Sequence, residues 1–119
     1  MDKPRTMILL NYKIGSHVNP EVYDDWLRST DNPFFNNIPG VKRYANWKVV
    51  DEMIGTVEFT HYDLLEIEDL ASWKTVWDNK SLQEFANAWT EQWSIHGTGV
   101  EYEGLNYQVV LAEEIAAPD

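Results

Sequence analysis

Four short stretches of this chain are rich in apolar and β-favouring residues, in places in loose alternation with polar ones, and this pattern predicts four β-strands. The stretches cover residues 7–14, 41–50, 56–67 and 105–111. The first stretch carries apolar residues on both of its faces, which favours a strand in the middle of a sheet. Only the turn at 51–55 separates the second stretch from the third. That short link predicts an antiparallel hairpin.

Two longer stretches instead carry apolar residues at helical spacing. The first helix is predicted to begin at the N-cap Asn19, with Pro20 in its first turn, and to run to about Thr30. It should end at Asp31–Pro33, because the residue before a proline avoids the helical conformation. Its apolar stripe is Val22, Tyr23, Trp26 and Leu27. Phe34 and Phe35 are then expected in a short irregular segment under the sheet.

The second of these helices has the clearest periodic pattern in the chain. Ser81 and Glu84 have the spacing of a capping box at its start. Its stripe recurs every three to four residues, at Leu82, Phe85, Ala86, Trp89 and Trp93. A short helix that bears Trp73 and Trp77 should precede it, capped by Asp69 or Ser72.

The predicted element order is βαββαβ, which indicates an α+β, ferredoxin-like fold. In this fold a four-stranded antiparallel sheet carries its helices on one face. Residues 1–119 are interpreted as a single domain, with an ordered core over about 6–112. The helix-free face still carries apolar side chains such as Leu9, and a bare face would be a large exposed patch. A second copy of the chain is the simplest cover, so a homodimer is predicted.

Charge and composition narrow the range of functions. The chain has 9 basic and 20 acidic residues, a net charge of −11, which disfavours nucleic acid and anionic membranes as partners. It has no cysteine, which excludes disulfides, thiolate metal sites and a cysteine nucleophile. Neither a membrane-spanning run nor a signal peptide is recognisable in the sequence. A cytoplasmic location is therefore expected.

The three histidines are the candidate proton-transfer groups. His61 is two positions before Asp63, so both side chains should share one face of the third strand. A carboxylate beside a histidine can orient it as a general base, although a hydrogen-bonded core histidine would give the same pattern. His17 follows the first strand and is either functional or an exposed turn residue. His96 is interpreted as surface. Such dispersed histidines predict no metal site.

The tryptophans suggest a ligand as well as a core. By periodicity each one is a core residue, yet five indoles on helices that face one small sheet exceed what filling requires: Trp26, Trp73, Trp77, Trp89 and Trp93. A gap between the helices and the sheet would suit a planar aromatic molecule. Arg28 and Asp31, at the end of the first helix, are either a surface ion pair or polar groups at the pocket rim.

Several segments together resemble a known superfamily. The βαββαβ order, the segment Tyr62–Ile67 leading into a capped helix, and the final strand resemble the dimeric α+β barrels. Within that superfamily, Asn11–Gly15, Trp26–Pro33 and Tyr62–Ile67 are similar to the RedY/HapK-like family. These small proteins are associated with prodigiosin and related pyrrole or indole pathways. The resemblance extends over roughly residues 7–115.

This resemblance implies a dimeric α+β barrel with a pocket in each protomer, between helices and sheet. It also implies chemistry on aromatic intermediates without a metal or cofactor. By position, Arg28 and Asp31 match the family's helix-end motif, and Tyr62 and Glu66 match its strand motif. The resulting substrate-binding candidates are Tyr12, Trp26, Arg28, Asp31, Tyr62, Trp89 and Trp93.

The favoured hypothesis is a cofactor-independent enzyme that cyclises or condenses a small pyrrole, indole or polyketide-like intermediate. In this hypothesis His61 or His17 moves protons and Asp63 orients a histidine. One alternative is a cofactor-free monooxygenase of the same barrel type. Another is a non-catalytic barrel that binds small molecules or responds to stress.

Overall fold

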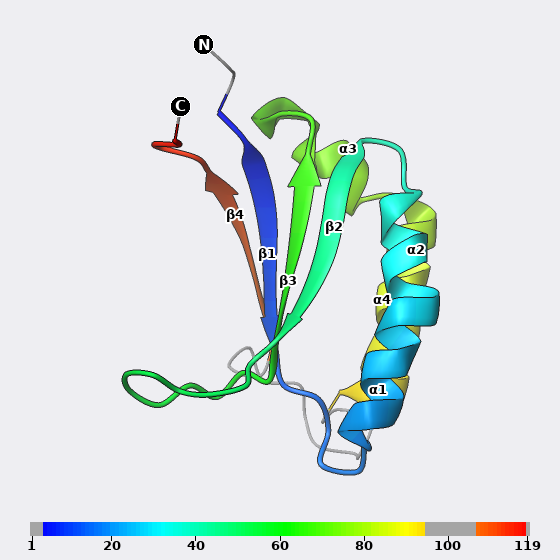
Figure 1. Ribbon diagram of the computed structural model, residues 1–119. Helices are drawn as coiled ribbons and strands as arrows, with labels where there is room; N and C mark the ends of the chain where they lie inside the picture. Colours follow the sequence, from blue (N-terminus) through cyan, green and yellow to red (C-terminus); the bar gives the residue numbers. More distant parts are fainter. Residues whose placement is uncertain (1–3, 95–106, 119) are drawn as a thin grey trace.

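One antiparallel sheet of four strands organises the protein. The computed structural model describes residues 4–94 and 107–118 (Figure 1). The sheet order is β2-β3-β1-β4, and each neighbouring pair is antiparallel. The strands are β1 (Thr6–Tyr12), β2 (Val41–Lys48), β3 (His61–Ile67) and β4 (Tyr107–Glu113). This confirms the predicted α+β fold, with β1 in the interior of the sheet as expected.

All the helices lie on one face of this sheet (Figure 1). They are α1 (Pro20–Trp26), the π-helical turn η1 (Leu27–Asp31), α2 (Asn32–Asn36), the 3-10 turn η2 (Leu70–Ser72), α3 (Trp73–Trp77) and α4 (Lys80–Trp93). Within the described ranges, no helix has both the length and the apolar character needed to cross a membrane.

The first helical rod is longer than the sequence predicts. The expected stop at Asp31–Pro33 is wrong, because α1, η1 and α2 follow one another without a break up to Asn36. In the π-helical turn the N–H of Asn32 donates to the carbonyl of Leu27, five residues back. Pro33 follows this π-helical turn directly and has no N–H to donate back to it. The segment with Phe34 and Phe35 is therefore helical, and Phe35 is buried in the core.

Two other boundaries also differ from prediction. The third strand begins at His61, and residues 49–60 form a connection that extends away from the sheet on the side opposite the helices (Figure 1). Helix α4 is capped by Asn79, whose side chain accepts the Leu82 N–H at 3.1 Å, so the capping box at Ser81 is wrong. Regular β2–β3 pairing ends at Lys48 and His61, with one further backbone bond between Val49 and Thr60, so residues 56–59 lie outside the strand despite their β-propensity.

The helical stripes are largely confirmed. Leu82, Trp89 and Trp93 are buried beneath α4, as are Tyr23 and Leu27 beneath the first rod. Val22 departs from its predicted stripe, since 55% of it is exposed. The predicted connection over 95–104, with His96, lies outside the described residues.

Two clusters of buried side chains lie between the sheet and the helices. The aliphatic cluster consists of Ile8, Leu10, Phe35, Ile38, Tyr44, Leu65, Ile67, Val76 and Leu82. The aromatic cluster consists of Tyr12, Ile14, Tyr23, Leu27, Trp89 and Trp93. Strand β1 supplies both, because Ile8, Leu10 and Tyr12 follow one another along the same face.

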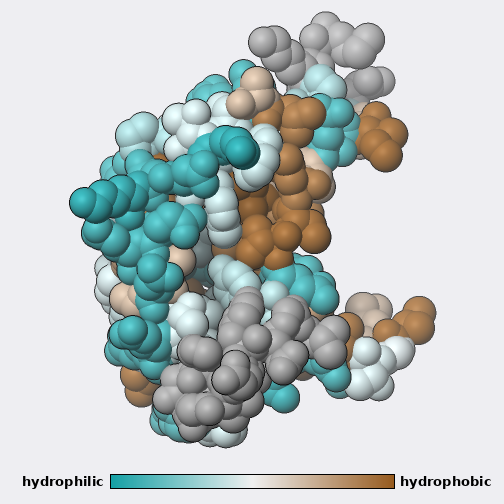
Figure 2. Space-filling model, turned by 180° about the vertical axis from the view of Figure 1, so that it is seen from behind, coloured by the Kyte–Doolittle hydropathy of each residue, from teal (hydrophilic) through white to brown (hydrophobic). Residues whose placement is uncertain are grey.

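The opposite face of the sheet is apolar and partly uncovered. Leu9 lies in the centre of this outer face, paired in register with Leu64 and Val110. Figure 2 shows hydrophobic side chains gathered in a hollow on this side of the molecule. The nearby 49–60 connection carries Met53 and Ile54, which are 93% and 95% exposed.

Candidate functional site

Polar side chains replace aliphatic ones at one end of the helix-covered face. On β3, His61 and Asp63 precede Leu65 and Ile67 along the same face, and all four are buried. The neighbouring strand β2 also carries polar residues at this end, since Asn46 lies opposite Asp63 and Lys48 lies opposite His61. Strand alternation thus gathers a set of polar groups beneath the first helical rod.

The carboxylate that hydrogen-bonds to His61 comes from α1. His61 Nε2 lies 3.2 Å from Asp24 Oδ1, and Lys48 Nζ donates to Asp24 Oδ2 at 2.9 Å. The prediction that Asp63 orients this histidine is corrected here, because Asp63 bonds to Tyr44 and Asn46 instead. Successive same-face positions on a strand lie about 6.6 Å apart, which is too far for a direct bond between compact side chains.

Burial favours a neutral ring at His61. Burial lowers the pKa of His61, and the nearby Asp24 offsets this only in part. Burial alone would raise the pKa of Asp24, but hydrogen bonds from Lys48 and His61 outweigh it and lower that pKa, so Asp24 is ionised. We therefore assign the ring proton to Nε2, facing Asp24, which leaves the Nδ1 lone pair 2.8 Å from the Thr60 hydroxyl.

The Thr60 hydroxyl can turn away from His61 Nδ1. This hydroxyl also lies 3.4 Å from the Tyr12 carbonyl oxygen, which gives the hydroxyl proton a second acceptor. Rotation of one hydroxyl group would therefore free Nδ1 to accept a proton. This arrangement is suited to general-base chemistry.

A second polar network links Asp31, the last residue of η1, to Asp63. The Tyr44 hydroxyl lies 2.7 Å from Asp31 Oδ2 and 2.9 Å from Asp63 Oδ2. The Asn46 amide donates to both carboxyl groups, each at 3.0 Å. Burial raises the pKa of Asp31 to about 6. Burial, with the charge of Asp31 in addition, raises the pKa of Asp63 to about 7.

The aromatic cluster is joined to this network through hydroxyl groups. Trp89 Nε1 donates to the Tyr23 hydroxyl at 2.8 Å, and Tyr23 donates to the Tyr12 hydroxyl at 2.8 Å. The Tyr12 proton is then available for Asp63, and this hydrogen bond lowers the pKa of Asp63. The chain of donors therefore ends on a carboxyl group.

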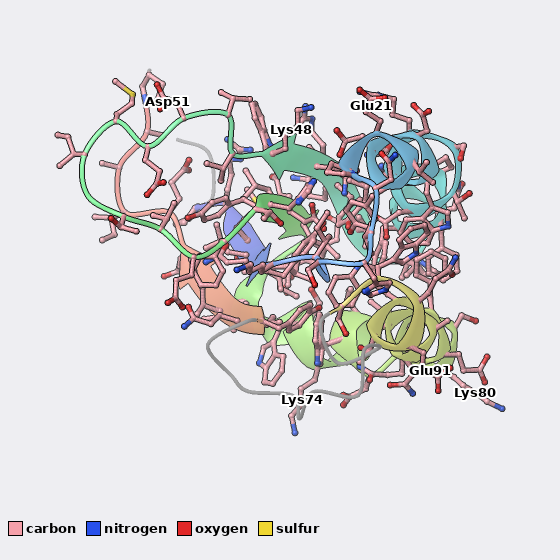
Figure 3. The ribbon with its side chains drawn as sticks, turned by 90° about the horizontal axis from the view of Figure 1, so that it is seen from below. Glu21, Lys48, Asp51, Lys74, Lys80 and Glu91 are labelled. Carbon is pink, nitrogen blue, oxygen red and sulfur yellow. The ribbon has the colours of Figure 1, made fainter. Side chains whose placement is uncertain are left out.

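Two cavities adjoin these networks. The edge pocket, of about 540 Å³, lies between the first helical rod and β2, and its walls include Asp24, Lys48 and His61. Arg28 and Arg43 also line it. Figure 3 shows Lys48 between α1 and the connection that carries Asp51. The inner cavity, of about 20 Å³, is lined by both buried aspartates and Tyr44, together with Tyr12, Trp89 and Tyr107.

The structure divides the predicted site residues among several places. Tyr12, Asp31, Asp63 and Trp89 meet at the inner cavity, and His61 and Arg28 meet at the edge pocket. Arg28 pairs with Asp25 at 2.8 Å. The predicted surface pair of Arg28 with Asp31 is therefore wrong, because Asp31 points into the core.

Trp26 and Trp93 belong to the ring packing around Tyr23. Trp26 stacks on Tyr23 and on Phe85, with ring centroids 5.8 and 5.6 Å apart. Trp93 meets Tyr23 edge to face at 5.2 Å. The Trp93 indole N–H is buried without a hydrogen-bond partner among the described residues. These two rings support the wall of the site without lining either cavity.

His17 lies at the end of α4. It is exposed, and its Nε2 is 3.2 Å from the Gln92 carbonyl oxygen. Its ring lies against Gly15, where an added Cβ would come within 2.5 Å of it. Gly15 also donates to the Trp93 carbonyl at 2.7 Å. His17 and Gly15 thus hold the loop before α1 against the end of α4 through hydrogen bonds.

The two strand-motif residues face away from the helices. Tyr62 alternates with His61 and Asp63, so it lies on the outer face, with Phe59 edge to face at 5.9 Å. Glu66 accepts from Arg5 at 2.9 Å, a hydrogen bond that lowers its pKa. Tyr62 therefore lies outside both cavities.

Sequence reasoning missed Asp24, Tyr44, Asn46 and Lys48. The last three have a usable signal, because they alternate along β2 as His61 and Asp63 do along β3. Asp24 has no comparable signal, since it depends on how the helix is rotated. Among the described residues, no group of three or more acidic or histidine side chains is placed to hold a metal ion.

Comparison with solved structures shows where this fold recurs. An ethyl tert-butyl ether D (EthD) family protein from Bacillus halodurans aligns with a TM-score of 0.68 and 14% identity, covering 93% of this chain and 99% of that one. HapK from Hahella chejuensis aligns with a TM-score of 0.66 and 10% identity, covering 96% of each chain.

A further neighbour is a dabb family protein with a ferredoxin-like fold from Mesorhizobium loti. Its TM-score is 0.58 at 8% identity, with 98% of this chain and 100% of that chain covered. At such identities these likenesses show the fold alone. No curated protein matches the sequence. Residues 6–98 match the family described as REDY-like protein HapK. The chain therefore belongs to the RedY-like HapK family.

Proposed function

We propose that this protein is a cofactor-independent enzyme that cyclises or condenses a small aromatic intermediate of the pyrrole, indole or polyketide-like kind. The observation that carries the proposal is His61 on the wall of the edge pocket, neutral and hydrogen-bonded to an ionised Asp24. A neutral imidazole can accept a proton near pH 7, and its carboxylate partner stabilises the imidazolium that forms.

Cyclisation or condensation of a reactive precursor needs little more than this. The pocket has to hold two reacting atoms close together and to move one proton from carbon or nitrogen to a base. A volume of about 540 Å³ is within the range of small-molecule sites. Arg28, Arg43 and Lys48 line it beside Asp24, so its charge suits a ligand with an anionic substituent such as a carboxylate.

Replacement of His61 by glutamine tests the proposal. A panel of pyrrole, indole and polyketide-like precursors is incubated with the wild type, and products are followed by mass spectrometry. Turnover should fall about 10²- to 10⁴-fold in His61→Gln. Lys80→Gln, at an exposed position on α4, is the matched control and should leave turnover unchanged. Unchanged turnover in His61→Gln would remove this histidine from the mechanism.

The same assay separates the alternatives. Oxygen uptake that is stoichiometric with product would indicate a monooxygenase in place of a cyclase. Quenching of tryptophan fluorescence without any product, across the whole panel, would indicate a binding protein.

We also propose that the protein functions as a homodimer that pairs through the outer face of the sheet. Leu9, Leu64 and Val110 form an apolar centre on that face, and Trp47 is 56% exposed nearby. Covering such a face with a second sheet removes apolar area from water. A second copy of the chain is the simplest partner with a matching surface.

Light scattering on a sizing column tests the dimer. Leu9→Asp should produce a monomer, because a carboxylate would be buried at the centre of the pairing face. Val22→Asp, on the exposed side of α1, is the control and should keep the wild-type mass. A wild-type protein that is monomeric at about 0.1 mM would rule out the dimer at concentrations relevant to function.

A further inference from the structure

The Tyr44 hydroxyl lies between two buried carboxyl groups. Its distances to Asp31 Oδ2 and Asp63 Oδ2 are 2.7 and 2.9 Å, both within the range of a strong hydrogen bond. A phenol has one proton to donate. If both carboxyl groups were ionised, one carboxylate oxygen would face the lone pairs of the phenol with no hydrogen between them. Both contacts are satisfied only if a second proton is present.

We propose that Asp31 and Asp63 hold one proton between them through Tyr44, and that this unit is a proton donor and acceptor at the inner cavity. This inference rests on the proposed function and deepens it, since it adds a proton source to the base at His61. In the arrangement that satisfies every contact, Asp63 donates to Tyr44 and Tyr44 donates to Asp31. The unit then carries a single negative charge.

The surroundings favour that single charge. Each aspartate is 4% exposed, and within the described ranges their hydrogen-bond partners are neutral phenol and amide groups. The titratable groups facing the pair are Tyr12 from β1, Tyr23 from α1, Tyr44 from β2 and Tyr107 from β4. None of these phenols brings a positive charge, and α4 contributes only apolar or indole side chains to the cavity. A second buried negative charge would have no compensation.

The carboxyl pair and His61 border different cavities, and Tyr44 lines both of them. His61 and Asp63 are two residues apart on one face of β3, which is about 6.6 Å along the strand. A proton that leaves a ligand atom for His61 can be balanced by one that passes from Asp63 to a ligand oxygen. The base then gains one positive charge and the pair one negative charge, and no oxidant or reductant is needed.

The inner cavity limits what the pair can contact. Its volume of about 20 Å³ exceeds the roughly 10–15 Å³ that a single water needs. It therefore fits one water molecule or one substituent of that size. The chemistry of the pair fits a neutral carbonyl or hydroxyl oxygen, since this can accept a hydrogen bond from Asp63 and would not be repelled by the charge on Asp31.

Carbon-13 NMR of protein labelled at the aspartate carboxyl carbons tests the inference without any ligand. In the wild type, two carboxyl signals should titrate together, with the upper step near neutrality and well above that of an ordinary aspartate near about pH 4. Asp31→Asn should remove one of these signals and lower the midpoint of Asp63 by about one unit or more, because the neighbouring charge is lost. Asp63→Asn assigns the other signal.

Two further variants sharpen the result. Tyr44→Phe should weaken the coupling between the two titrations and raise the midpoint of Asp31, since the phenol donates to the ionised form of that carboxyl group. Asp51→Asn, in the exposed connection, should leave both midpoints unchanged. The inference is overturned if both wild-type carboxyl groups ionise independently near about pH 4. Since the wild type alone gives that result, no variant has to fold for the inference to fail.

The titration and the turnover assay test different claims, and each claim can be overturned while the other stands. Two ordinary aspartates combined with loss of turnover in His61→Gln would overturn only the shared proton. Coupled aspartates combined with full turnover in His61→Gln would overturn only the role of His61.

Discussion

The aliphatic and aromatic clusters are neighbours under the same helices, yet they differ in chemistry. Strand β1 gives Leu10 to the first and Tyr12 to the second, and on β3 Leu65 belongs to the first while His61 contacts Tyr12 and Tyr23 of the second. Over most of the aliphatic cluster, burial and close packing are the only stabilising forces. In and beside the aromatic cluster, hydroxyl, imidazole and carboxyl groups are hydrogen-bonded to one another.

This difference separates stability from function. An aliphatic side chain gains free energy on burial, about 25 cal/mol for each Å² of apolar surface removed from water. A buried carboxyl group opposes folding at neutral pH, and its raised pKa measures that opposition. Such groups cluster at functional sites more often than elsewhere. We therefore expect substitutions of the aliphatic side chains in the first cluster to change stability, and substitutions among the hydrogen-bonded polar groups, Tyr44 included, to change the response to pH and ligand.

The largest expected effect is that of Leu65→Ala. Leu65 is fully buried in the aliphatic cluster, so its truncation should cost about 2–5 kcal/mol of unfolding free energy. The exposed Val22→Ala is the control and should cost less than about 0.5 kcal/mol. Urea denaturation measures both. Equal, small losses would show that the aliphatic cluster does not dominate stability.

The next largest expected effect is a change of the unfolding free energy with pH. The folded protein keeps a proton on Asp63 up to about pH 7, whereas an unfolded chain releases it near about pH 4. Between these values the folded state binds more protons, so its unfolding free energy falls as pH rises. For one proton the slope is at most about 1.4 kcal/mol per pH unit. Asp63→Asn mimics the protonated group and should flatten this slope.

His61 also changes the unfolding free energy in this pH range, but in the opposite direction. Its pKa is lowered by burial, so the unfolded chain binds the extra proton and stability is lost as pH falls below about 6.5. This contribution is present in the wild type and in Asp63→Asn alike, so the difference between them reports on the coupled pair of Asp63 and Asp31. Asp51→Asn should follow the wild-type curve. An Asp63→Asn curve that runs parallel to the wild type would contradict a raised pKa at Asp63.

The smallest effect concerns the two charges beside His61. Asp24 raises the pKa of His61 and Lys48 lowers it, so Asp24→Asn and Lys48→Met should shift this pKa in opposite directions. The Lys48→Met shift should be about one unit or less, since the Lys48 side chain is 54% exposed and water screens it, and the Asp24→Asn shift should be the larger, since Asp24 is hydrogen-bonded to the ring. A histidine proton titration by NMR gives both values. Shifts of the same sign would show that the pairing of these charges is misassigned.

Much of the fold could be predicted from the sequence. The alternation along Ile8, Leu10 and Tyr12 and the stripe on α4 are strong periodic patterns, and the structure keeps both. The continuation past Pro33 could not be predicted, because a π-helical turn leaves no distinct pattern in the sequence. Residues 56–60 alternate like a strand, but within the described residues regular pairing with β2 ends at Lys48, and beyond it only Thr60 makes bonds between backbone groups, to Val49 and Tyr12. Local propensity gives way to tertiary pairing there.

The candidate site was predictable only where a strand carries it. His61 and Asp63 share a face by strand geometry, and Asn46 and Lys48 could have been added by the same argument. The side chains that the first helical rod contributes to the site could not have been predicted in this way. Asp24 reaches His61, and Asp31 reaches Tyr44, because of how that rod is rotated about its axis and placed over the sheet. No local pattern encodes that placement.

Ligand mapping tests the central claim most directly, namely that the polar end of the helix-covered face is the functional site. Nitrogen-15-labelled protein is titrated with pyrrole-2-carboxylate, which combines a planar ring with an anionic group. Amide shifts should concentrate at Asn46, Lys48 and His61, around the edge pocket. Shifts confined to the outer face at Leu64 and Val110, or no shifts at about 10 mM probe, a weak-binding limit, would contradict the account.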